Sequence, residues 1–240
     1  MKFLLHAFIY FTISAVSAEA SSLAEWNFSD LPATSGTNNL PATDHNPLLS
    51  VVPTLKVSNT SSSSPISPFY NPEGIWAVGT SGPAVNLAEA LAIDRFIEFT
   101  LEPESGYELN LISLILSISV FNLESSISIF SSLQGFEIED VIDTHPLLAT
   151  DTANPQEIMV SLNHTGILAP VTVRIYPHNV GTNILWFGDS DDPSISGIEV
   201  TGTVPEINTA SLAFASLIFL WLSSILYSRR RIRSAGSKSL

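Results

Sequence analysis

The sequence contains no cysteine, and basic residues are scarce between positions 21 and 204. Without cysteine the chain forms no disulfide, zinc–thiolate site or thiolate nucleophile, so its hydrophobic core has to stabilise the fold. Residues 21–204 hold three Lys or Arg, namely Lys56, Arg95 and Arg174, against 21 Asp or Glu, a formal net charge of 3 − 21 = −18. Such a surface repels nucleic acid, which we exclude as a partner.

Sequence signatures of catalysis are also missing. The five histidines form no His-Glu-x-x-His zinc motif, and no Gly-x-Ser-x-Gly turn presents a serine nucleophile. No segment assembles an acid, a base and a nucleophile. We therefore expect a protein that is not an enzyme and that requires no cofactor.

The N-terminal residues 1–20 are typical of a secretory signal peptide. Lys2 precedes an apolar stretch from Phe3 to about Ala15, and small residues follow it, so we expect cleavage after Ala18 or Ala20. The apolar stretch is too short to span a bilayer comfortably, which disfavours a retained signal anchor. The sequence therefore predicts export.

The C-terminal residues carry the pattern of a membrane anchor. Ala210–Tyr227 contains no charged residue, and an α-helix of that length reaches about 27 Å, close to the ~30 Å hydrocarbon core of a bilayer. Arginines follow at once and mark the cytoplasmic side, with a tail at 234–240: Arg229, Arg230, Arg231 and Arg233. A buried core helix is the alternative, but four arginines would not follow it so abruptly. We expect residues 21–203 to lie outside the cytoplasm.

Between these ends, apolar and polar residues alternate with the period of β-strands. In VTVRIY, for example, Val171, Val173 and Ile175 point one way and their neighbours the other. About nine such strands, separated by glycine and proline turns, predict an all-β fold: an antiparallel β-sandwich resembling a jelly roll over residues 21–203. Only residues 85–92 favour a short helix, and residues 58–68 read as a polar loop.

One strand changes phase along its length. Apolar residues fall on odd positions at Tyr107, Leu109 and Leu111, and then on even positions from Ile112 to Val120. A strand that shifts by one residue turns its apolar face outward. The pattern therefore predicts a β-bulge or a break near Ile112.

Candidate binding residues are few. Asp189, Asp191 and Asp192 offer carboxylate oxygens of the kind calcium prefers, although Pro193 and the missing twelfth-position glutamate exclude an EF-hand loop. A calcium loop and a solvated acidic loop both remain open. A second acidic run, 137–143, precedes His145, and a solvated edge is the better interpretation there than a metal site. Trp26, Trp76 and Trp186 are candidates either for stacking on sugar rings or for the core.

The C-terminal signal resembles the PEP-CTERM sorting signal of Gram-negative bacteria. The matching parts, within 204–233, are the motif Val204, Pro205 and Glu206, the span 210–227 and the arginine cluster 229–233. Ile207 departs from the family, which usually has a second proline there. The resemblance implies recognition by an exosortase and association with extracellular polysaccharide. The ectodomain resembles β-sandwich domains of unassigned activity borne by such proteins, in segments such as GIEVTGTVPE.

These observations predict a non-enzymatic protein of the cell surface or of a biofilm matrix. The leading alternative is a carbohydrate-binding module, which needs an exposed aromatic platform formed by residues such as Trp76 or Trp186. A polysaccharide lyase or hydrolase on the same fold is the weaker alternative, because it needs converging Tyr, His, Arg or paired carboxylates and residues 21–204 hold only two arginines.

Overall fold

The computed structural model describes residues 20–28, 39–58, 66–71, 75–80, 84–120, 125–151, 153–179, 184–189, 192 and 194–207, with backbone alone for 66–71, 75–80 and 184. The chain divides into two compact units, 1–205 and 206–240. Nearly all of the signal peptide, the span 210–227 and the arginine cluster lie outside the described residues. Within the described ranges, no helix is long and apolar enough to cross a membrane.

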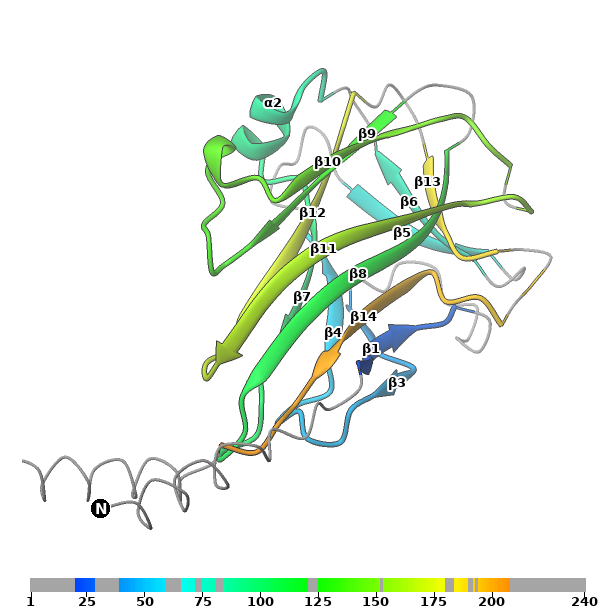
Figure 1. Cartoon of the computed structure of the whole chain (residues 1–240). Helices are drawn as coiled ribbons and strands as arrows, with labels where there is room; N and C mark the ends of the chain where they lie inside the picture. Colours follow the sequence, from blue (N-terminus) through cyan, green and yellow to red (C-terminus); the bar gives the residue numbers. More distant parts are fainter. Residues whose placement is uncertain are drawn as a thin grey trace, which may run out of the picture. The chain divides into compact units, whose positions relative to one another are not determined.

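The first unit is an antiparallel β-sandwich of two sheets, as the alternation predicts (Figure 1). The larger sheet has eight strands in the order β3-β1-β14-β8-β13-β6-β5, with β11 paired to the other side of β8. Its strands are β1 (Ser21–Trp26), β3 (Asp44–His45), β5 (Ile66–Asn71), β6 (Ile75–Thr80), β8 (Leu109–Val120), β11 (Gln156–Ile167), β13 (Ile184–Phe187) and β14 (Ile198–Thr203).

The second sheet has six strands in the order β10-β9-β12-β7-β4-β2. They are β2 (Asn39–Pro41), β4 (Thr54–Val57), β7 (Ile97–Leu101), β9 (Ser125–Ser131), β10 (Asp143–Leu147) and β12 (Val171–His178). On β12, Val171, Val173 and Ile175 are fully buried between the sheets, as their alternation predicts. Tyr176 belongs to the opposite face, yet it is only 1% exposed, because a helix covers that end of the outer face.

That helix is α2 (Leu87–Ala92), which confirms the helix predicted at 85–92. It begins where the side chain of Asn86 accepts a hydrogen bond from the Glu89 amide at 2.9 Å, a standard N-cap. Together with the 3-10 turn η1 (Ile138–Asp140), α2 lies over a second hydrophobic cluster on the outer face of the six-stranded sheet. Its buried members are Ala84, Ala90, Phe96, Phe130 and Tyr176.

The predicted break in β8 is a register shift at Ile112. On the β14 side, Gly202 faces Leu111 while Thr201 faces Ser113, so Ile112 has no partner there. The shift confirms the predicted β-bulge, but the new phase begins at Leu114. Ile112 itself is 40% exposed and does not belong to the core.

Other strands were not predicted. In β1, a register shift between Ser22 and Ala24 leaves Leu23 and Ala24 both buried, which removes the alternation. The edge strand β10 carries Pro146 and charged residues, a composition that protects sheet edges but reads as loop. The predicted loop at 58–68 is corrected at its end, because β5 begins at Ile66.

Candidate functional site

The outer face of the six-stranded sheet carries a row of charged side chains. In the antiparallel register, Arg174 of β12 faces Glu98 of β7, which faces Lys56 of β4, which faces Asn39 of β2. Residues directly opposite each other project to the same face, so these side chains form one line across four strands. This line brings together two of the three Lys or Arg residues of 21–204.

Arg174 is fixed by several contacts at once. Its Nε lies 3.0 Å from Oε2 of Glu98, and its Nη1 donates to the hydroxyl of Tyr176 at 3.4 Å. Its guanidinium carbon lies over two rings, 3.9 Å from the centre of Phe96 and 4.1 Å from that of Phe136. Stacking and ion pairing use the flat guanidinium together, which a lysine could not reproduce.

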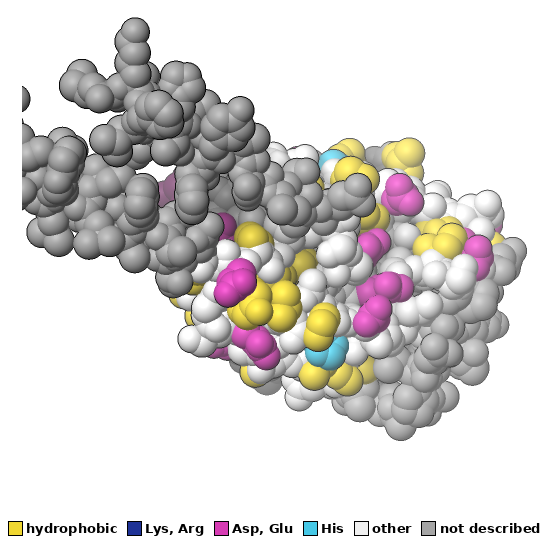
Figure 2. Space-filling view, turned by 60° about the horizontal axis from the view of Figure 1, so that its bottom comes forward, with side chains coloured by type: hydrophobic (Ala, Val, Ile, Leu, Met, Phe, Trp, Pro, Cys, Tyr) yellow, Lys and Arg dark blue, Asp and Glu magenta, His cyan; other side chains and the backbone are white. Residues whose placement is uncertain are grey.

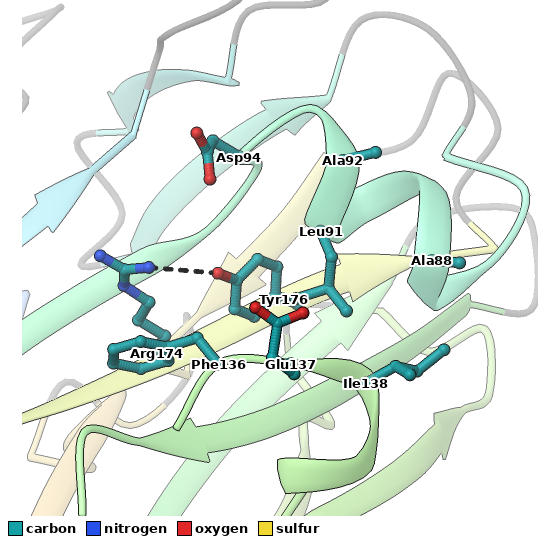
Figure 3. Close-up of a pocket in the computed structure, with 9 residues that line it drawn as sticks. All are labelled: Ala88, Leu91, Ala92, Asp94, Phe136, Glu137, Ile138, Arg174 and Tyr176. Atoms are coloured by element: carbon teal, nitrogen blue, oxygen red, sulfur yellow. Dashed lines mark hydrogen bonds between the residues drawn. The ribbon is translucent and has the colours of Figure 1, made fainter. Parts of the chain in front are cut away.

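A cleft of about 460 Å³ opens above this arginine, beside α2 and η1 (Figure 3). Figure 3 shows Arg174 and Tyr176 on β12, with Leu91 of α2 nearby. Asp94 and Glu137 line the cleft and are exposed, so their carboxylates reach solvent. The lining is Ala88, Leu91, Ala92, Asp94, Phe136, Glu137, Ile138, Arg174 and Tyr176.

Tyr176 lies against the rings below this cleft. Its ring meets Phe130 edge-on at 5.2 Å and lies tilted against Phe96 at 5.4 Å between centres. Burial raises the pKa of Tyr176 above its ordinary value, and the hydrogen bond from Arg174 only partly opposes that shift. The phenol is therefore protonated at neutral pH and accepts the hydrogen bond from Arg174.

A second cleft, of about 410 Å³, lies on the same face beyond Glu98. Arg174 lines the first cleft, Glu98 lines the second and the two side chains are bonded, so this ion pair lies between the two clefts. We call the two clefts together the groove. The second cleft is lined by Asn39, Val51, Val52, Thr54, Lys56, Glu98, Phe99 and Thr100.

Among the groove residues, Glu137 alone belongs to a site weighed from the sequence, the acidic run 137–143, for which a solvated edge was the better interpretation. The available signal was the rarity of basic residues, since Lys56 and Arg174 stand out in a chain with so few. What places them together is the pairing of β4, β7 and β12, which the local pattern does not encode.

The residues of the predicted sorting motif continue directly from β14. Val204 packs partly buried against the core, and the carbonyl of Pro205 accepts a hydrogen bond from the Glu108 amide at 3.0 Å. Glu206 is exposed. The motif therefore begins against the sandwich rather than on a free linker, and its recognition by an exosortase stays a prediction.

The predicted calcium loop is described only in part. Asp191 lies outside the described residues, whereas Asp189 is buried and its Oδ1 accepts a hydrogen bond from the Asp192 amide at 3.2 Å. Asp192 is exposed and accepts from the amide and hydroxyl of Ser194, which lowers the pKa of its carboxyl. Calcium binding here stays a prediction.

The other acidic run lies at a sheet edge. His145 Nε2 and Asp143 Oδ2 form a hydrogen bond of 2.9 Å on β10, while Glu139 and Asp140 belong to η1. Across the described ranges, no group of three His, Asp or Glu side chains is arranged to hold a metal ion.

The tryptophans are divided between the core and the surface. Trp26 is fully buried, stacks at a tilt on Phe99 and donates from Nε1 to the Leu40 carbonyl at 3.0 Å. Trp186 is half-buried on β13, between the fully buried Leu185 and Phe187, so it lies on the outer face of the eight-stranded sheet. The side chain of Trp76 lies outside what the structure describes.

The outer face of the eight-stranded sheet, with the adjoining end of the sandwich, differs from the groove in its charged side chains. Figure 2 shows acidic side chains interspersed with hydrophobic ones there. On this sheet Glu25 faces Glu199 across β1 and β14, and Met159 is 60% exposed on β11. This surface holds none of the described Lys or Arg residues.

Comparisons with known proteins give structural similarity only. No protein-family model matches the chain, and no curated protein matches it. The family 29 carbohydrate-binding module CBM29-2, solved with mannohexaose, is similar with a TM-score of 0.36 at 10% identity, covering 73% of this chain and 97% of that one. A CBM4 structure is similar with a TM-score of 0.38 at 10% identity, covering 74% of this chain and 97% of that one. The enzymatically active domain of tailspike protein 4 of bacteriophage CBA120 has a TM-score of 0.27 at 11% identity. The match covers 63% of this chain and 19% of that one.

Proposed function

We propose that this chain is a non-catalytic, exported surface protein whose β-sandwich binds a glycan in the groove on the six-stranded sheet. The observation that carries the proposal is the position of Arg174. It is held over two aromatic rings and bonded to Glu98 and Tyr176, between two open clefts. A side chain fixed in this way loses little conformational freedom when a ligand binds.

The groove offers what sugar hydroxyls and rings require. The exposed carboxylates of Asp94 and Glu137 accept hydrogen bonds, and Asn39, Thr54 and Thr100 in the second cleft both donate and accept. Exposed apolar groups such as Ile138, Val51 and Val52 provide surfaces for the faces of sugar rings. Few precisely placed polar groups on an open, partly apolar floor are typical of binding sites.

Two features favour binding over catalysis. A tyrosine that serves as a general base has to lose its proton, and burial raises the pKa of Tyr176 instead. A glycosidase keeps one carboxylic acid protonated by burying it, whereas Asp94 and Glu137 are both exposed. A hydrolase that uses this carboxylate pair is the second candidate, favoured only by their shared cleft.

A matched pair of variants tests the proposal. The full chain, purified in detergent, is titrated with bacterial exopolysaccharides and plant glycans by affinity electrophoresis and calorimetry. Asp94→Asn should weaken binding by about 10- to 100-fold, because a hydrogen bond to a charged group contributes roughly 1.5–3 kcal/mol. Glu157→Gln, an exposed change on the other sheet, is the control and should bind like the unmodified chain.

Two other results would speak against glycan binding as the function. Failure of the unmodified chain to bind any glycan would reject the proposal. Release of reducing ends from a bound glycan, abolished by Glu137→Gln, would replace it with the hydrolase.

The C-terminal region supports the proposal that the protein is sorted by an exosortase. Pro205 lacks an amide donor and biases Val204 toward extended structure, and the charge of Glu206 keeps the motif in water. We expect the mature form to lose residues from near Glu206 onward. In a host with an exosortase, the double variant Pro205→Ala, Glu206→Ala should stay full length while the unmodified chain is shortened. If both remain full length in the inner membrane, the segment is only an anchor.

Membrane orientation follows from the arginine cluster 229–233, which favours the cytoplasmic side. A reporter fused after Leu240 should be active only if it works in the cytoplasm. Activity of a strictly periplasmic reporter at this position would reverse the orientation.

A further inference from the structure

The second cleft contains the most exposed basic side chain of the described residues. Arg95 is buried and Arg174 is half-buried, whereas Lys56 is exposed on β4. In the parts of the chain that the structure describes, no carboxylate lies within ion-pair distance of Lys56; Arg174 is the basic residue that pairs there, with Glu98. Lys56 therefore presents an ammonium group that forms no ion pair with the described side chains.

The local charge balance follows from the register. Glu98 lies between Arg174 and Lys56 in the row, and its Oε2 is bonded to Arg174 at 3.0 Å. One carboxylate between two cations leaves one positive charge, and that charge lies on the Lys56 side. Among the described residues that line the second cleft, Glu98 is the one carboxylate, whereas Asp94 and Glu137 line the first cleft.

We infer that the second cleft is a subsite for an anionic substituent of a glycan, a carboxylate or a sulfate, with Lys56 as its counter-ion. This inference rests on the proposed glycan binding and narrows its ligand to acidic polysaccharides. The first cleft, with two exposed carboxylates, then receives a neutral part of the same chain. Asn39 and Thr54 beside Lys56 supply further donors to the anion.

The acidic surface elsewhere does not prevent this. Residues 21–204 carry a net charge of −18, which repels a polyanion at long range. At physiological ionic strength, however, charges interact over a Debye length of about 8 Å, so an anion within the cleft responds mainly to Lys56 and its neighbours. Repulsion by the surrounding acidic surface disfavours binding of the same glycan next to the cleft.

The test uses two matched pairs of polymers with the full chain in detergent. One pair is a uronate polysaccharide and its carboxyl-reduced form, and the other is a sulfated polysaccharide and its desulfated form. The unmodified chain should bind the charged member of at least one pair about tenfold more tightly than its neutral form. The pair that shows the preference identifies the anion.

Lys56→Met should abolish this preference for the charged form, and Lys56→Arg should retain it. Since Lys56 is exposed and has no ion pair in the described residues, neither change should alter the melting temperature. Equal binding of charged and neutral forms by the unmodified chain, or an unchanged preference in Lys56→Met, would overturn the subsite and leave glycan binding intact. No binding of any polymer would reject the glycan function itself.

Discussion

The guanidinium carbon of Arg174 lies 4.1 Å from the centre of the Phe136 ring. Phe136 belongs to the segment before η1, so this contact ties the segment to β12 at the edge of the first cleft. A cation over an aromatic face contributes about 0.5–1 kcal/mol at partly exposed sites. The contact therefore affects both the stability of the fold and the shape of the groove.

A double-mutant cycle measures this contact. Arg174→Met and Phe136→Leu should show a coupling energy of about 0.5–1 kcal/mol in urea unfolding of the full chain. The control cycle pairs Lys56→Met with Phe136→Leu, which line different clefts, and its coupling should be close to zero. Strict additivity of Arg174→Met and Phe136→Leu would show that the stack contributes nothing.

The buried His178 should make stability depend on pH. Its Nε2 lies 2.9 Å from Ser128 Oγ, and its Nδ1 is buried without a hydrogen-bond partner in the described part. Burial lowers the pKa of His178 in the folded chain, so below about pH 6.5 the unfolded state binds more protons. The contribution of neutral His178 to the free energy of unfolding is complete above pH 6.5. It is lost as the pH falls toward the pKa of His178 in the folded chain, by at most about 1.4 kcal/mol per pH unit.

His178→Gln should therefore have a shallower loss of unfolding free energy than the unmodified chain between pH 7.5 and pH 5. Urea midpoints at several pH values measure it, and the difference between the two proteins removes the common effect of the carboxylates. Burial lowers the pKa of His164 as well, so His164→Gln should act in the same direction. Parallel pH profiles for the His178 variant and the unmodified chain would contradict the prediction.

Gly202 should not tolerate a side chain. It faces Leu111 beside the bulge in β8, and an added Cβ would overlap the carbonyl oxygen of Asn110 and lie 2.6 Å from a methyl carbon of Leu23. Gly202→Ala should therefore lower the free energy of unfolding by about 1–3 kcal/mol. Gly166→Ala is the comparison, because that site has open space and only a positive φ of 68° to strain. An unchanged melting temperature for Gly202→Ala would contradict the packing argument.

Calcium should stabilise the chain if the 189–192 loop holds it. An ion that binds only the folded state raises the melting temperature, and the rise continues with the logarithm of the ion concentration above its Kd. Asp191→Asn should lose that gain, whereas Asp151→Asn, an exposed change on another loop, should keep it. A melting temperature that is the same in millimolar calcium and in chelator would leave Asp189 and Asp192 as a hydrogen-bonded acidic loop.

The period-two alternation was sufficient to predict much of the sandwich. It identified Val171, Val173 and Ile175 as core residues, and the odd-to-even change near Ile112 located the bulge. These predictions work because side chains on a strand alternate between faces whatever its partners are. Where a bulge or an edge removes the alternation, as at Leu23 and Ala24 or at Pro146, the strand was missed.

The groove was decided by the tertiary structure alone. Lys56 and Arg174 lie far apart in the sequence, and each reads there as an isolated surface charge. They become neighbours of Glu98 because β4 and β12 pair with the two sides of β7 in one particular register. Tyr176 likewise occupies an outward position in its strand and is buried because α2 and the η1 segment lie over it. The sequence by itself determined that residues 21–204 hold few basic residues. Long-range strand pairing decided that two of them share one face with Glu98, because pairing depends on the whole core and not on local periodicity.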